Sequence, residues 1–105
     1  MMIARWSIDA RFGHKAKVID EMRRWIREVA SKIGWTPDKV RLQTGSIGAL
    51  ESTVQFEVVV DNLADLHASW ERLAGVLEHK KWSRELEPHV MSGTPKWEVF
   101  RVIDD

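Results

Sequence analysis

The feature that most constrains the fold is a change in hydrophobic periodicity along the chain. Residues 15–33 place apolar side chains every three or four positions: Val18, Met22, Trp25, Ile26, Val29 and Ile33. This spacing predicts an amphipathic helix. Residues 52–61 place them at every second position: Val54, Phe56, Val58 and Val60. That alternation predicts a strand with one buried face.

Similar patterns predict the remaining elements. Strands are expected over residues 2–10, 39–46 and 96–103, and a short helix from about His79 to Leu86. A second long helix is expected over 63–77, where Asn62 can cap its first turn. The apolar stripe of that helix consists of Leu63, Leu66, Trp70, Leu73 and Leu77.

The order of these elements predicts the fold class. Four strands and two principal helices, in the order β-α-β-β-α-β, indicate an α+β, ferredoxin-like domain. Both helices are expected on one face of a four-stranded antiparallel sheet. A length of 105 residues fits one domain over residues 1–105.

The other face of the sheet is expected to carry a mixed set of residues, including Arg5, Ser7, Gln55 and Glu57. If the first and third strands are neighbours, Arg5 and Glu57 form a cross-strand pair. Two interpretations stay open. The face is either solvated, as in many antiparallel sheets, or pressed against the same face of a second subunit.

Charge and composition exclude several classes of function. Sixteen Lys and Arg residues balance sixteen Asp and Glu residues, which argues against nucleic acid or an acidic membrane as the main partner. There is no cysteine, so disulfides, thiol nucleophiles and cysteine-bound metals are excluded. No apolar run approaches the ~20 residues that span a bilayer, and a cytoplasmic location is expected.

The C-terminal segment resembles a known superfamily. A short helix contains Trp82, Pro88 and Val90 follow it, Gly93 forms a turn, and residues 97–102 read Trp-Glu-Val-Phe-Arg-Val. Together with the opening strand and the long helix, this pattern is similar to the dimeric α/β-barrel superfamily. The NIPSNAP-like group is the nearest in pattern, and its sister groups, the stress-responsive-barrel and the antibiotic-biosynthesis-monooxygenase-like proteins, stay open as alternatives.

The resemblance implies a homodimer whose two sheets form one barrel, with ligand pockets inside the barrel or between each sheet and its helices. It does not imply one chemistry, because members include cofactor-independent oxygenases, isomerases and haem-degrading enzymes. The haem-degrading members use a histidine, an asparagine and a tryptophan. The only asparagine here, Asn62, is expected to cap a helix, so no cofactor is expected.

His79 and His89 are the candidate catalytic residues, because they flank the short helix that borders the pocket in the resembling families. Either could carry a proton near neutral pH. An ordinary surface histidine is the commoner use of such a residue. The four histidines show no metal-ligand spacing, and no metal site is expected. His67 is expected at the flank of the second helix.

The candidate binding residues are Arg5, Gln55, Glu57, Trp82 and Trp97. A carboxylate beside a guanidinium could orient a polar ligand, although a structural ion pair explains the same residues. Trp82 and Trp97, like Trp35, have no place in a helical stripe and are candidates for pocket walls or dimer contacts.

The sequence therefore favours a homodimer that binds or transforms a small apolar or aromatic molecule, by oxygenase-like or isomerase-like chemistry. A pocket that combines His79 or His89 with Arg5 or Glu57 would support this hypothesis. The alternative is a regulatory or structural homodimer without chemistry. An RNA-recognition domain is disfavoured, because the strand over 53–61 lacks the basic and aromatic pattern of such domains.

Overall fold

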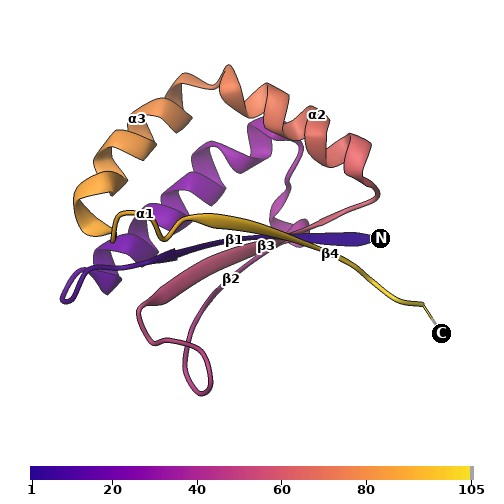
Figure 1. The fold of residues 1–105 in the computed structure, drawn as a ribbon. Coiled ribbons are helices and arrows are strands. Elements are labelled where there is room, and N and C mark those ends of the chain that lie inside the picture. The colour runs from indigo at the N-terminus through magenta and orange to yellow at the C-terminus, as the bar shows by residue number, and fades with distance from the viewer. Residues whose placement is uncertain (105) are drawn as a thin grey trace.

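The computed structural model describes residues 1–104, so the predicted domain limit at Asp105 lies outside the described residues. In chain order the elements are β1 (Met2–Asp9), α1 (Lys15–Glu28), β2 (Val40–Thr44), β3 (Thr53–Val60), α2 (Leu63–Ala74), α3 (Leu77–Leu86) and β4 (Lys96–Arg101). The strands form one antiparallel sheet in the order β2-β3-β1-β4. Figure 1 shows the α-helices together on one side of this sheet. The predicted ferredoxin-like α+β fold is confirmed.

Strand register separates the residues of the sheet into two sets. Trp6 of the central strand β1 lies opposite Phe56 of β3 and opposite Trp97 of β4, on the face that the helices cover. Arg5 lies opposite Glu57, on the uncovered face. Because side chains alternate along a strand, residues of the two sets cannot share a pocket within one subunit.

Phe56 lies at the centre of the core. Four tryptophan rings have their centroids 5.0–6.1 Å from its ring: Trp6, Trp25, Trp35 and Trp97. Tilted and edge-to-face aromatic pairs of this kind contribute about 0.5–1.5 kcal/mol each beyond their burial. Aromatic packing is therefore a main contribution to the stability of this small core.

The helix predicted over residues 15–33 ends earlier than expected. α1 stops at Glu28, and a tighter 3₁₀ turn follows over Ala30–Ile33. Gly34 then takes the left-handed conformation, with φ of 88°, and the Trp35 N–H donates to the Ala30 carbonyl. This reversal directs Trp35 into the core, where it is 2% exposed. Trp35 also lines a separate hollow of about 250 Å³ next to Gly34 and Val60, outside the aromatic residues of β1 and α3.

The apolar stripe predicted for the second long helix is wrong at both ends. Gly75 ends α2, so Leu77 belongs to α3, and its side chain is 74% exposed. Leu63 lies in the first turn of α2 and is 58% exposed. Leu66 is buried as predicted, and Ser69 is buried beside it through a hydrogen bond to the Ile33 carbonyl. Within residues 1–104, no helix is long and apolar enough to cross a membrane.

Candidate functional site: an aromatic cleft

An aromatic cleft lies between strands β1 and β4 and helices α2 and α3. Its central hollow has a volume of about 230 Å³ and is lined by Trp6, Trp25, Phe56, Leu73, His79, Trp82, Ser83 and Trp97. Two adjoining hollows measure about 260 and 330 Å³. One shares Trp6, Trp82 and Ser83 with the central hollow, and the other shares Leu73, His79 and Trp97. We call the three hollows together the aromatic cleft.

Local structure explains why these side chains meet. Trp6 and Trp97 are directly opposite each other on neighbouring strands, so they project from the same face of the sheet. His79 and Trp82 lie three positions apart on α3, and therefore on one side of that helix. Their rings stack with an interplanar angle of 22° and a centroid distance of 5.8 Å. A strand pair and a helix thus present aromatic rings to the same space.

A hydrogen bond joins His79 to Trp25 in the core. The Nε1–H group of Trp25 donates to Nδ1 of His79 over 3.0 Å. An indole nitrogen can only donate, so Nδ1 must accept. The proton of the neutral imidazole is therefore on Nε2, which makes no hydrogen bond to the described residues.

The environment of His79 favours the neutral form of its ring. Burial lowers the pKa of His79 below the ordinary value of 6.5. The residue also lies in the first turn of α3, where the helix dipole disfavours a positive charge. A protonated ring would in addition place an N–H group on Nδ1, facing the N–H group of Trp25.

The central hollow has no charged wall. Among its lining residues only His79 is ionisable, and Ser83 donates its hydroxyl hydrogen to the His79 carbonyl over 2.9 Å. Ligand pockets of this type bury an apolar molecule and orient it through few polar groups. The central hollow therefore suits a small, uncharged and largely apolar or aromatic molecule, while the adjoining 260 Å³ hollow also has the exposed Glu87 in its lining.

The structure divides the predicted site residues between the two faces of the sheet. His79, Trp82 and Trp97 line the aromatic cleft. Arg5 and Glu57 lie on the uncovered face, as does Gln55, which accepts a 3.4 Å hydrogen bond from Ser7. The structure therefore does not place a candidate histidine in one pocket with Arg5 or Glu57, because the sheet separates them.

Glu57 is the centre of a polar network on the uncovered face. Its carboxylate accepts hydrogen bonds from Arg5 at 2.7 Å, Arg41 at 2.8 Å and Gln43 at 2.9 Å. Burial alone would raise the pKa of Glu57, but these three donors outweigh it and hold the pKa below its ordinary value. The predicted Arg5–Glu57 pair is confirmed, and its carboxylate accepts hydrogen bonds from three side chains of the same subunit.

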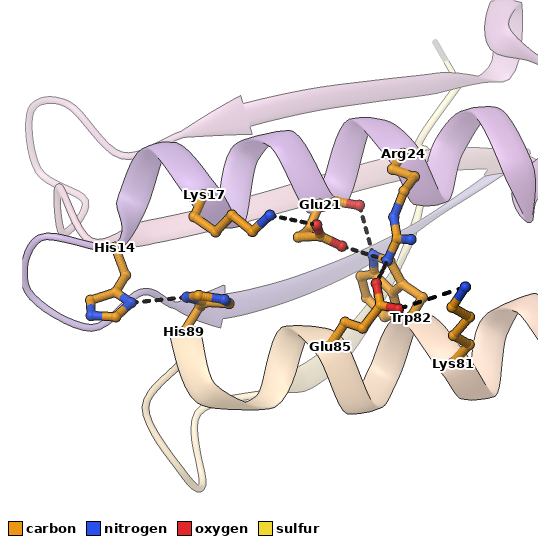
Figure 2. Close-up of polar contacts among 8 residues, drawn as sticks. All are labelled: His14, Lys17, Glu21, Arg24, Lys81, Trp82, Glu85 and His89. Carbon is orange, nitrogen blue, oxygen red and sulfur yellow. Dashed lines mark hydrogen bonds and ion pairs between the residues drawn. The ribbon is translucent and has the colours of Figure 1, made fainter.

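His89, the other candidate catalytic residue, contacts His14 and lines none of the three hollows of the cleft. The two Nδ1 atoms are 3.0 Å apart, so one ring donates to the other (Figure 2). This bond joins the start of α1 to the turn that follows α3. His67 is on the surface, 3.1 Å from Glu71.

A second polar contact between α1 and α3 supports the wall of the cleft. Arg24 bonds Glu21 on its own helix and Glu85 on α3, both at 2.6 Å. The indole N–H of Trp82 donates to the Glu21 carbonyl at 2.6 Å, as Figure 2 shows. These contacts fix the position of Trp82, which is 6% exposed.

Metal chemistry has no evident ligand set in this arrangement. Over residues 1–104, no three or more His, Asp or Glu side chains are grouped so that they could hold a metal ion. The Asn62 side chain accepts a hydrogen bond from the Asp65 N–H at 2.8 Å, which confirms its predicted role as a helix cap.

Solved structures with the same arrangement of elements identify the fold. A NIPSNAP family protein from Agrobacterium tumefaciens superposes with a TM-score of 0.80 at 16% identity, over 98% of this chain and 86% of its own. SnoaB, a cofactor-independent oxygenase from Streptomyces nogalater, superposes with a TM-score of 0.70 at 12% identity, over 99% and 94%. An antibiotic-biosynthesis-monooxygenase-like protein from Deinococcus radiodurans superposes with a TM-score of 0.63 at 11% identity, over 100% of this chain and 95% of its own.

This chain has the NIPSNAP and monooxygenase-like ferredoxin fold. The resemblance inferred from the C-terminal segment is thereby confirmed at the level of the fold. No family model and no curated protein matches the sequence. A shared fold does not determine function, so function has to be argued from the cleft of this chain.

Sequence reasoning missed several residues of the site. Trp6, Trp25 and Phe56 line the central hollow, and none of them is among the residues predicted for the site. The three-residue spacing of His79 and Trp82 on one helix was a usable signal for their stacking. The Trp25–His79 and His14–His89 bonds had no such signal, because they join residues 54 and 75 positions apart.

Proposed function

We propose that this protein binds a small apolar or aromatic molecule in the aromatic cleft and acts on it without a cofactor, by oxygenase-like or isomerase-like chemistry. The observation that carries the proposal is the cleft itself: aromatic side chains surround one half-buried, neutral histidine. The fold shared with a cofactor-independent oxygenase supports it by analogy.

His79 is the proposed catalytic residue. Its Nε2–H group can donate a hydrogen bond to a ligand oxygen and stabilise negative charge that develops there. Trp82 and Trp97 are the proposed binding residues, because their rings form walls of the cleft. A ligand stacked between them would be held by aromatic contacts rather than by charge.

We further propose that the protein is a homodimer in which the uncovered sheet faces meet. That face exposes Val59 and Phe100, which are 38% and 44% accessible. The guanidinium of Arg5 lies 5.0 Å from the centre of the Phe100 ring. Apolar side chains around a satisfied ion-pair network are typical of a surface that is covered in an assembly.

The alternative function is a regulatory or structural homodimer without chemistry. One observation favours it: the Glu57 carboxylate already has three donors, so the polar centre of the uncovered face offers little to a ligand. In that case Arg5, Gln55 and Glu57 serve the dimer interface and bind no ligand. The two functions differ in whether the aromatic cleft takes up a molecule.

Filling the cleft tests the proposal. Ser83 is exposed and borders two of the hollows, so Ser83→Phe should occupy ligand space without disturbing the core. We expect naphthalene and 1-indanone to raise the melting temperature of the natural protein. The melting temperature of Ser83→Phe should not respond. At a ligand concentration of 100 times Kd, the expected stabilisation is about 2.7 kcal/mol.

The matched control is Lys80→Phe, which adds the same ring to an exposed position of the same helix that borders none of the three hollows. Lys80→Phe should respond to both compounds like the natural protein. Equal responses of Ser83→Phe and Lys80→Phe would show that binding occurs outside the cleft. No response of the natural protein to either compound would favour the alternative function.

A further inference from the structure

We propose that Trp25 is a positioning residue that fixes the proton of His79 on Nε2, and that the aromatic cleft consequently selects neutral ligands with a hydrogen-bond acceptor, such as aromatic carbonyl compounds. This inference rests on the proposed function and names the class of ligand. The juxtaposition that carries it is the 3.0 Å bond from Trp25 Nε1 to His79 Nδ1 inside the cleft wall.

The chemistry of the two rings leaves one tautomer. A neutral imidazole in water exchanges its proton between Nδ1 and Nε2, and each nitrogen can donate or accept. Indole Nε1–H can only donate. The bond to Trp25 therefore requires a lone pair on Nδ1 and places the proton on Nε2.

Packing holds the His79 ring in this orientation. Trp82 stacks on one face of the ring at an angle of 22°, and Trp25 meets it edge-on at 71°. A ring turned by half a rotation would place a carbon atom against the Trp25 N–H and lose the bond. The Nε2–H donor is thus pre-organised, which lowers the entropic cost of bonding a ligand.

Two other polar groups of the cleft add no donor for a ligand. Trp70, which lines the 330 Å³ hollow, has a buried Nε1–H without a protein partner in the described chain. The Ser83 hydroxyl already donates to a backbone carbonyl. The Trp70 N–H has almost no accessible area, and the Ser83 oxygen can only accept, so the preference for a ligand with an acceptor rests on the Nε2–H group of His79.

The lack of charged residues around the central hollow excludes charged ligands. The central hollow is lined by no lysine, arginine, aspartate or glutamate. A carboxylate or an ammonium group would lose its hydration there without an opposite charge to replace it. Burial lowers the pKa of His79, so the ring is not a ready counter-ion for a carboxylate near neutral pH. A neutral carbonyl, ether or heteroaromatic nitrogen satisfies the Nε2–H donor at no such cost.

Ring nitrogen NMR tests the role of Trp25 without any ligand. Long-range ¹H–¹⁵N spectra distinguish the two tautomers of His79 directly. We expect the Nε2–H form alone in the natural protein, and a mixture of both tautomers in Trp25→Phe, which keeps a ring but removes the donor. Trp70→Phe is the control, because it removes an indole N–H that does not bond His79. Unchanged tautomer in Trp25→Phe, or a mixture in the natural protein, would overturn the positioning role.

Three ligands of similar size test the proposed preference for a hydrogen-bond acceptor. 1-Indanone carries a hydrogen-bond acceptor, indole carries a hydrogen-bond donor, and indane carries neither. By calorimetric titration, the natural protein should bind 1-indanone about fivefold more tightly than indane, the size expected of one neutral hydrogen bond. It should bind indole less tightly than 1-indanone, because indole has no carbonyl acceptor for the Nε2–H group of His79. His79→Asn removes Nε2–H while its side-chain oxygen can still accept from Trp25. Its amide N–H groups lie nearer the backbone than Nε2 does, so it should bind 1-indanone and indane equally.

The outcomes separate this inference from the proposed function. If all three compounds bind the natural protein equally, the cleft binds aromatic molecules, but the proposed preference for ligands with a hydrogen-bond acceptor is wrong. If none binds, the proposed function and the selection both fail, while the NMR result still decides what Trp25 does. Should Trp25→Phe fail to fold, the comparison of His79→Asn with the natural protein decides the selection alone.

Discussion

His79 shows how the surroundings of one residue decide its chemistry. Trp25 occupies Nδ1, and burial lowers the pKa of the imidazole. The sequence identified His79 only by its place near a short helix, and the same argument selected His89. The structure distinguishes them, since His89 bonds His14 and lines no hollow of the cleft.

The lowered pKa of His79 predicts a dependence of stability on pH. In the unfolded chain His79 binds a proton below its ordinary pKa of 6.5, whereas the folded protein resists protonation. The contribution of neutral His79 to the free energy of unfolding is therefore fully present above pH 6.5. It is lost as the pH falls through the pKa that His79 has in the folded protein. Urea denaturation at pH 7.5 and pH 5 should show a larger loss for the natural protein than for His79→Asn.

The difference between the two proteins isolates His79 from the other three histidines, which both proteins share. A wild-type curve parallel to that of His79→Asn over this range would contradict the account of His79.

At the scale of elements, the cleft depends on how α3 is held against α1. Arg24 bridges Glu21 and Glu85, and the His14–His89 bond closes the same interface at its other end (Figure 2). The side chain of Glu21 is only 9% exposed. A carboxylate so well buried needs its cationic partners, which makes Arg24 more than a surface ion pair.

Replacing Arg24 by methionine should therefore destabilise the protein by about 1–3 kcal/mol, because the buried Glu21 carboxylate loses a charged hydrogen-bond donor. The control is Arg23→Met, which breaks a 3.6 Å pair with Asp20 whose side chains are 64% and 69% exposed. Arg23→Met should lower the free energy of unfolding by less than about 0.5 kcal/mol. Equal losses in chemical denaturation would show that the contact of Arg24 with the buried Glu21 carboxylate contributes no more than a surface ion pair.

The elements also show what could be predicted from the sequence. Periodicity located every strand and α1, because burial of one face repeats along each element. It misplaced Leu63 and Leu77, since the pattern does not report where a helix stops facing the sheet. Trp35 and the contacts of His79 depend on a chain reversal and on pairs distant in sequence, which a local pattern does not contain.

At the scale of the whole molecule, the sheet has one face covered by helices and one uncovered (Figure 1). The uncovered face combines the Glu57 network with the apolar side chains of Val59 and Phe100. A second copy of the chain placed on this face would bury those side chains and leave both aromatic clefts accessible, because each cleft lies on the helical side of its own sheet.

The proposed dimer predicts a mass of twice 12.2 kDa in size-exclusion chromatography with light scattering. Val59→Asp places an unpaired charge on the uncovered face and should shift the protein to the monomer. Leu77→Asp, at a 74% exposed position on the helical side, should leave the dimer intact. A natural protein that is monomeric at high concentration would contradict the proposed assembly.

The central claim, that the aromatic cleft takes up a small aromatic molecule, is tested most directly by the indole N–H signals of the six tryptophans during a titration with 1-indanone. The account predicts saturable shifts for Trp6, Trp82 and Trp97, which line the central hollow, and little change for Trp35, which does not line it. Signals that stay unchanged up to the solubility limit of the compound, or that move only for Trp35, would contradict it.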